Sequence, residues 1–162
     1  MQQILSLNDI LKLDKIKRIN LVNSLSGFKS ANLIGTTSKI KKENLAIFSS
    51  VIHVGSDPPL LGFLVRPNKP VRHTYTNIKQ TGIFTINHVC SKTFNDAHHT
   101  SAKYPEDISE FEKTNLTPEY NKSFLAPFVK ESSINNLLFA YFEYPPVLLN
   151  TSNNPSAPST VS

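Results

Sequence analysis

Apolar, β-branched segments separated by short polar or proline-containing connections dominate the chain between residues 31 and 89. They predict strands over 31–37, 45–54, 60–65 and 83–89, because β-branched residues suit a pleated surface and the breaks contain turn formers. Residues 60–65 are apolar throughout, which is typical of a strand covered on both faces. The preceding Ser56-Asp57-Pro58-Pro59 is predicted to be a connection, since proline cannot donate to a strand ladder.

Sequence patterns that predict helices are fewer and shorter than those that predict strands. Thr74 or Thr76 is the predicted N-cap of one helix, and Ser91 of another. The ranges predicted as helical are 75–81, ended by Gly82, 92–103, ended by Tyr104-Pro105, and 106–113. Residues 7–18 have an imperfect apolar period, so a surface segment whose apolar residues touch the core stays open. The predicted fold class is mainly β with a few short helices.

The second half of the chain has weaker patterns. Residues 114–133 are predicted to be irregular, and 137–144 to form a late strand. Residues 151–162 lack the apolar side chains that would repay the entropy of ordering, so a disordered polar tail is predicted there. The 162 residues therefore divide into one domain over 1–150, large enough to bury a core, and this tail.

Composition excludes several classes of protein. No apolar run approaches the roughly 20 residues needed to cross a bilayer, and the N-terminus lacks a secretory signal. The lone Cys90 excludes an internal disulfide and agrees with a cytoplasmic protein. Residues 1–42 hold eight Lys and Arg against two Asp, which suits an anionic partner such as phosphate or simply a solvated face. A nucleic acid is a weaker interpretation because aromatic stacking residues are not interleaved.

Common catalytic and metal-binding patterns are missing. His98 and His99 are adjacent and would point about 100° apart on a helix, so they cannot face one metal. The glycines form no dinucleotide-binding or P-loop pattern, and no nucleophile elbow is present. Small hydroxyl residues do gather near basic ones at strand ends. Hydroxyls, backbone N–H groups and a cation are what a phosphate requires, although Ser and Thr at strand ends are usually turn formers.

Three ordered stretches carry a family resemblance. The first runs from Ala31-Asn32-Leu33-Ile34-Gly35-Thr36-Thr37 through Asn44-Leu45-Ala46-Ile47-Phe48-Ser49-Ser50 to Asp57-Pro58-Pro59-Leu60-Leu61-Gly62-Phe63. The second joins Arg66-Pro67 to His73-Thr74-Tyr75-Thr76-Asn77-Ile78 and Gly82-Ile83-Phe84-Thr85-Ile86-Asn87. The third joins Ala97-His98-His99-Thr100-Ser101-Ala102-Lys103-Tyr104-Pro105 to Ala126-Pro127-Phe128-Val129-Lys130-Glu131-Ser132. Over about residues 20–150 the chain resembles the flavin reductase-like family, whose fold is an FMN-binding split β-barrel.

The resemblance implies a set of cofactor-binding residues. Members bind FMN, sometimes FAD, in a groove at the interface of a homodimer. The residues implied near the flavin or its phosphate are Thr36, Thr37, Asn44, Leu45, Ala46, Ser49, Ser50, Arg66, His73, Thr74, Ser101, Lys103 and Tyr104. Arg66, with His73 and Thr74, is assigned to the phosphate end, since a guanidinium binds phosphate bidentately. No metal site is expected.

The implied activity is transfer of a hydride from NAD(P)H to flavin. The isoalloxazine carries this reaction, so the protein need only position two rings, and no catalytic residue is assigned. Members usually continue well past the equivalent of residue 150, so the barrel is predicted to be incomplete at its C-terminus. A non-catalytic flavin-binding protein, or a truncated remnant of such an enzyme, is therefore the alternative. Partners are expected to be flavin, a nicotinamide nucleotide and a second copy, with no membrane and no nucleic acid.

Overall fold

A computed structural model describes residues 5–57, 59–66, 71–105, 107–121 and 124–139. Its elements, in chain order, are α1 (Leu7–Lys12), α2 (Lys15–Ser24), β1 (Asn32–Thr37), β2 (Glu43–Phe48), β3 (Ile52–Ser56), β4 (Pro59–Gly62), α3 (His73–Thr81), β5 (Ile83–His88), α4 (Phe94–His99), the 3₁₀ helix η1 (Glu110–Lys113), β6 (Pro118–Glu119), β7 (Phe128–Val129) and β8 (Asn135–Phe139). The predicted tail and the end of the predicted late strand lie outside the described residues.

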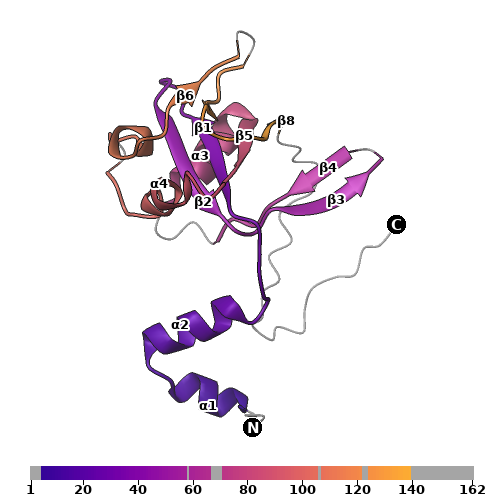
Figure 1. Ribbon diagram of the computed structural model, residues 1–162, viewed down its shortest axis with the longest axis vertical. Coiled ribbons are helices and arrows are strands. Elements are labelled where there is room, and N and C mark those ends of the chain that lie inside the picture. Colours follow the sequence, from indigo (N-terminus) through magenta and orange to yellow (C-terminus); the bar gives the residue numbers. More distant parts are fainter. Residues whose placement is uncertain (1–4, 58, 67–70, 106, 122–123, 140–162) are drawn as a thin grey trace, which may run out of the picture.

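An antiparallel sheet of strand order β2-β1-β5-β8 forms the centre of the molecule (Figure 1). All six residues of β1 are buried, because β1 lies between β2 and β5 and both of its faces are covered. Two further pairs, β3–β4 and β6–β7, form separate two-stranded sheets. The described residues form a mixed structure of sheets and helices with no closed barrel, so the prediction of a mainly β chain was too simple.

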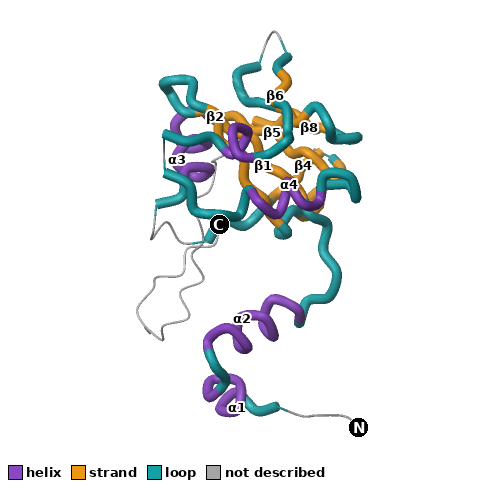
Figure 2. Tube along the Cα trace, turned by 60° about the vertical axis from the view of Figure 1, so that its left-hand side comes forward, coloured by secondary structure: helices purple, strands orange, loops and turns teal. Residues whose placement is uncertain are grey.

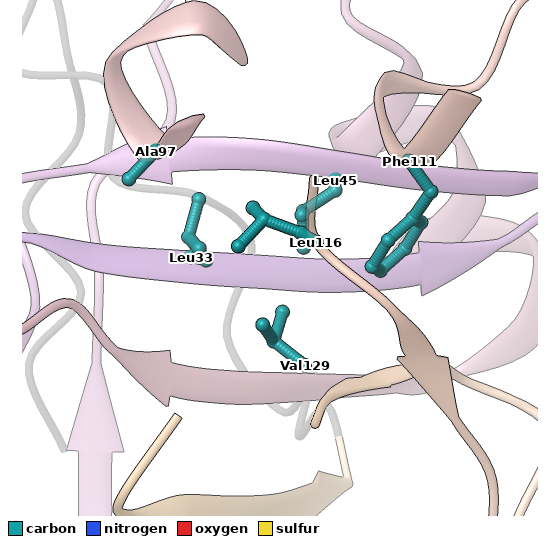
Figure 3. Packing of buried hydrophobic residues seen from close by; sticks show 6 residues of the cluster. All are labelled: Leu33, Leu45, Ala97, Phe111, Leu116 and Val129. Atoms are coloured by element: carbon teal, nitrogen blue, oxygen red, sulfur yellow. The ribbon is translucent and has the colours of Figure 1, made fainter. Parts of the chain in front are cut away.

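The two faces of the sheet bury different apolar clusters, as the alternation of side chains along a strand requires. On one face Leu33 and Leu45 pack with Ala97 of α4 and Phe111 of η1 (Figure 3). The same cluster includes Leu116 and Val129. On the other face Ile34, Phe84 and Ile86 pack with Ile78 of α3. The helices that follow the strands therefore cover both faces of the sheet.

For several predicted elements the structure confirms the central residues, while the ends differ. β1 and β5 match the predicted strands, and α3 ends at Gly82, whose φ of 72° lies in the left-handed region that glycine adopts without strain. The helix predicted over 92–103 is shorter, since α4 covers only Phe94–His99. The acidic helix predicted over 106–113 is reduced to η1, and β6 and β7 lie within the stretch predicted to be irregular.

Two strand predictions were wrong in their boundaries. The run 45–54 is not one strand: β2 ends at Phe48 and β3 begins at Ile52, where the chain leaves the central sheet. Pro59 was placed in a connection but is the first residue of β4, opposite Ser56, a position where the missing N–H costs little. The prediction that residues 60–65 are covered on both faces was also wrong, because Leu60, Leu61 and Leu64 are exposed.

The N-terminal segment forms two helices that project from the rest of the molecule in both views (Figures 1 and 2). Ser6 caps α1 through a capping box with Asp9, and the Asp14 carboxylate accepts from the N–H groups of Ile16 and Lys17 at the start of α2. Neither helix has a buried residue. The open possibility that residues 7–18 touch the core is therefore not realised.

Candidate functional site

A cavity of about 580 Å³ opens beside the turn between β1 and β2. This volume lies within the range that small-molecule sites occupy. Hydroxyl, amide, basic and acidic side chains alternate with aliphatic ones around it, so it can accept a ligand with polar edges and an apolar body. Its lining residues are Ser38, Lys39, Ile40, Lys42, Glu43, Asn44, Val71, His73, Thr76, Asn77, Gln80, Asp107 and Ile108.

A buried hydrogen-bond network forms one wall of this cavity. The side-chain amide of Asn44 donates to the hydroxyls of Thr36 and Thr74, at 3.1 Å each. The amide of Asn77 donates to the same Thr36 hydroxyl at 3.2 Å. The network joins β1, β2 and α3, and all four side chains are buried. Because both amide protons of Asn44 are engaged within the protein, this side chain acts on a ligand by fixing the cavity wall.

Charged groups surround the cavity mouth. The Lys42 ammonium forms an ion pair with Glu112 at 2.8 Å, which raises the pKa of Lys42 and lowers the pKa of the Glu112 carboxyl. The Tyr120 hydroxyl donates to the Glu43 carboxylate, and burial together with this hydrogen bond raises the pKa of Tyr120. The mouth therefore offers Lys42 as a cation while Glu43 is held by a neighbouring phenol.

A buried carboxylate supports β2 from behind. Glu110 is 8% exposed, and its carboxylate accepts the backbone N–H of Leu45 at 2.8 Å. β2 lies at the edge of the sheet, so this N–H has no strand to pair with on its outer side. Loss of solvation raises the pKa of Glu110, although the Leu45 N–H and the nearby His73 act in the opposite direction. Glu110 thus satisfies a backbone group at the position predicted to line the flavin ring.

The residues predicted to bind the cofactor fall into groups. Asn44 and His73 line the cavity, and Thr36 and Thr74 lie behind it in the Asn44 network. The Thr37 hydroxyl is 3.4 Å from the Lys42 carbonyl oxygen in the turn at the cavity's edge. Leu45 is fully buried and Ala46 is half-buried on β2.

A second group lies at the opposite end of β2. The Ser50 hydroxyl donates to the Leu64 carbonyl at 3.0 Å and accepts the Leu64 N–H at 3.2 Å. Exposed Ser49 comes directly before Ser50, and exposed Arg66 follows Leu64 by two residues, so both lie close to this clamp along the chain. Asn44 and Ser49 are five residues apart, about 16 Å along an extended strand. A ligand reaching both groups would have to be elongated.

The last predicted group follows α4. The Ser101 hydroxyl is used locally, donating to the His98 carbonyl at 2.7 Å, and Lys103 is exposed while Tyr104 is half-buried. None of these three side chains lines the cavity. The predicted residues therefore form one group at each end of β2 and a third group that follows α4 in the chain.

The sequence prediction missed several residues of the cavity. Asn77 could have been found, because it lies three residues after Thr74 and so shares its helix face. Lys39 and Lys42 stand in the basic stretch already noted, in the turn between two predicted strands. Glu110 gave only the indirect signal of a Ser-x-x-Glu capping box, Ser109 to Glu112, that places it in the first turn of a helix.

Residues 25–136 match the sequence model of the flavin reductase like domain, so the chain belongs to that family. The family agrees with the resemblance inferred from the sequence motifs, and it implies flavin binding. Within the described residues no helix is long and apolar enough to cross a membrane, and no group of three or more His, Cys, Asp or Glu could hold a metal ion.

Solved structures extend the comparison to the fold. A candidate flavin reductase with a split barrel domain from Shewanella frigidimarina is 51% identical, with a TM-score of 0.81 over 85% of this chain and 68% of that one. Nitrilotriacetate monooxygenase component B from Bacillus cereus is 22% identical, with a TM-score of 0.73 over 86% of this chain and 69% of its own, and shares the fold. A protein from Aquifex aeolicus is 34% identical over 93 residues, 56% of this chain and 47% of its own length. The chain thus spans about half the length of that relative.

Proposed function

We propose that the chain binds FMN and that the bound flavin accepts a hydride from NAD(P)H. Membership of the flavin reductase like family supports flavin as the ligand. The choice of FMN over FAD and of NAD(P)H as donor rests on the sequence resemblance. We also propose that it acts in the cytoplasm as a homodimer.

The observation that carries this proposal is the pair of polar groups at the two ends of β2. At one end the cavity combines aliphatic walls of Ile40, Val71 and Ile108 with amide and hydroxyl groups, which suits a planar ring system with polar edges. At the other end Arg66 is exposed beside the Ser50–Leu64 clamp, and a guanidinium is suited to bidentate recognition of phosphate. An FMN molecule is elongated in the same sense, with a ring system at one end and a phosphate at the other.

The residues present fit such a ligand, and each has a defined role in the proposal. Thr36, Asn44 and Thr74 fix the wall of the cavity, and Glu110 holds the backbone of Leu45 in place. Lys42 at the cavity mouth stabilises negative charge that develops on the ring edge. When bound, the isoalloxazine itself supplies the redox chemistry. The chain therefore acts by binding and orienting, which explains why no catalytic dyad is assigned.

A titration of the purified chain with FMN, followed by quenching of flavin fluorescence, tests the proposal. We expect Arg66→Ala to raise the Kd about tenfold or more, since a charge-assisted hydrogen bond contributes roughly 1.5–3 kcal/mol. The same variant should change the free energy of unfolding by less than about 0.5 kcal/mol because Arg66 is exposed. Lys92→Ala, which removes an exposed cation elsewhere, is the matched control. Equal loss of binding and stability in Arg66→Ala would contradict the assignment.

Hydride transfer needs its own measurement. Anaerobic addition of NADH or NADPH to the FMN complex should bleach the flavin absorbance. The second candidate function is a flavin-binding protein without turnover, because the same residues would bind the flavin whether or not a hydride is transferred to it. FMN binding without bleaching by either nucleotide would select this second function.

A further inference from the structure

Two apolar surfaces of the chain are left uncovered by the described residues, and we propose that they cover each other between two copies. One surface is the outer face of the β3–β4 hairpin, made by Ile52, Val54, Leu60 and Gly62. The other belongs to the N-terminal arm, residues 5–29, which contains α1 and α2. In the proposed dimer the arm of each copy docks on the hairpin face of its partner. The proposal rests on the homodimer proposed above and names the surfaces that form it, whatever the identity of the bound cofactor.

The hairpin face is a coherent apolar surface. Ile52 pairs with Gly62 across the two strands, and a Cβ added at Gly62 would lie 3.1 Å from Val54 Cγ2, so these residues share one face. Leu60 is on the same face, two residues before Gly62. Ile52 is 56% exposed, Val54 58% and Leu60 41%. The glycine leaves a shallow place between large aliphatic side chains, which a side chain from another surface can fill.

The hairpin has little support of its own. Among the described residues β3 and β4 pair only with each other, and the hairpin stands away from the central sheet in Figure 1. An isolated two-stranded hairpin is marginally stable in water, and it needs packing on one face to persist. Phe63 supplies such packing at the base, where its ring contacts Phe48 and Phe84. The face formed by Ile52, Val54 and Leu60 has no comparable cover among the described residues.

The N-terminal arm also has apolar side chains that need a surface to pack against. α1 has six residues and α2 has ten, lengths at which an isolated helix is marginal in water without tertiary packing. Large apolar side chains are exposed along its whole length: Leu7, Leu11, Ile16, Ile19, Val22, Leu25 and Phe28. The arm therefore needs a surface to dock on, and the hairpin face is an apolar surface that needs cover.

The pattern of apolar residues on α2 favours a protein surface over a lipid one. Ile16, Ile19, Val22 and Leu25 recur every three residues, so each is rotated about 60° from the one before. The apolar residues therefore wind around the helix, and Lys15 and Arg18 are interspersed among them. A flat bilayer would cover only part of such a winding band. A groove between protein elements can cover it from more than one side.

Charge and size favour a second copy as the occupant. The arm carries five Lys and Arg against Asp9 and Asp14, whereas Asp57 is the only charged residue between 49 and 65. A basic arm docking on the hairpin therefore meets an opposite charge and buries no like charge, while two arms docking on each other would repel. A reciprocal exchange commits the 25 residues of each arm, within the roughly 20–30 residues a side of a stable protein interface.

The direction of the arm also favours the partner over the chain's own hairpin. The arm leaves the molecule next to the base of the hairpin, since Asn32 pairs with Phe48, four residues before Ile52. From there it points away from the hairpin (Figure 1). Gly27 lies in this connection with a φ of 71° and with open space around it. An arm that extends outward from a shared base can reach the neighbouring copy around a two-fold axis, and the partner's arm can return the contact.

Cysteine cross-linking between differently tagged chains tests the pairing. In a Cys90→Ser background, one full-length chain carries Val22→Cys on the arm and the other carries Val54→Cys on the hairpin face. We expect mild oxidation to link the two tags. A partner chain with Leu125→Cys, an exposed position on neither surface, should give at least tenfold less product. Interchain product limited to this control level would overturn the proposal.

Two further outcomes identify the rival arrangements. A single chain carrying both Val22→Cys and Val54→Cys that links only to itself, at any dilution, would assign the hairpin face to its own arm and overturn the proposal. Wild-type chain that sediments as one 18.1 kDa copy and binds anionic vesicles would assign the arm to a lipid surface, with the same consequence.

Sedimentation measures the interface without covalent trapping. Wild type should sediment as two copies at micromolar concentration, and Val22→Asp or Val54→Asp should each weaken the dimer at least tenfold while leaving the circular dichroism spectrum unchanged. Leu125→Asp is the matched control and should stay dimeric. Dimers of wild-type strength in both Asp variants would refute the docking.

Discussion

The central sheet and the β3–β4 hairpin both carry large aliphatic residues, yet these residues are buried to opposite extents. Every residue of β1 is buried, whereas Ile52, Val54 and Leu60 of the hairpin are more than 40% exposed. β1 has a strand on each side and helices over both faces, whereas within the described part of the chain the two strands of the hairpin pair only with each other. An apolar segment therefore predicts that its side chains must be buried against something. Which element buries them is determined by the rest of the fold.

The two regions should respond very differently to one added methyl group. In β1, a Cβ at Gly35 would overlap the Pro127 carbonyl oxygen and lie 2.5 Å from the Thr85 hydroxyl, which donates a hydrogen bond to that carbonyl. Gly35→Ala should therefore lower the free energy of unfolding by about 3 kcal/mol, as expected for overpacking against backbone. Urea denaturation measures this change.

Gly62→Ala is the matched substitution in the hairpin. Its new Cβ would lie 3.1 Å from Val54 Cγ2, the end of an exposed side chain that can shift, and 3.9 Å from Ile52 Cγ1, an ordinary contact distance. We expect a loss below about 1 kcal/mol. Similar losses for the two alanine variants would show that the hairpin is packed as firmly as the sheet and would remove the contrast between them.

The two ends of β2 give a second comparison, between a buried and an exposed hydrogen-bond cluster. Asn44→Ala leaves the buried Thr74 hydroxyl without this donor and the Thr36 hydroxyl with Asn77 alone, which should lower the free energy of unfolding by roughly 2 kcal/mol. Ser50→Ala removes the clamp on Leu64 at an exposed site, where water can replace it, and should cost less than about 1 kcal/mol. Thermal unfolding of both variants decides the order, and a larger loss for Ser50→Ala would reverse the comparison.

The elements that were predicted best from the sequence are those determined by local residue patterns. β1, β5 and the end of α3 at Gly82 follow from short patterns and from one residue's backbone freedom. The break between β2 and β3 could not be predicted, because the run of apolar residues continues through it and only the pairing partners change. Likewise, the exposure of residues 60–65 depends on the absence of a covering element among the described residues, which composition does not encode.

The candidate site shows the same limit. Hydroxyl and amide residues at Thr36, Asn44 and Thr74 were identified from the family motifs, but their joint network depends on contacts between residues up to 41 positions apart. The support of Leu45 by Glu110 joins residues 65 positions apart. No spacing rule along the chain reports such contacts, because the distance in sequence between partners is set by the topology of the sheet.

The smallest expected effect is a difference in pH dependence between two carboxylates of η1, Glu110 and Glu112, which lie two residues apart. Burial raises the pKa of Glu110 above its ordinary 4.5, and the ion pair with Lys42 lowers the pKa of Glu112 below the same value. Between 4.5 and the raised pKa, folded Glu110 holds a proton that the unfolded chain has released. Its contribution to stability is thus present below pH 4.5 and is lost as the pH rises. The contribution of Glu112 is present above pH 4.5 and is lost as the pH falls.

Urea denaturation of Glu110→Gln and Glu112→Gln from pH 3 to 8 measures these contributions as differences from wild type. Relative to wild type, Glu110→Gln should gain stability as the pH rises above 4.5, because the buried charge is gone while the amide oxygen can still accept from Leu45. Glu112→Gln should lose stability over the same rise, and by a smaller amount, because solvent screens an exposed pair. If the free energy of unfolding depended on pH in the same way in both variants, Glu110 would be as hydrated as Glu112. Glu110 would then not be the buried support of β2.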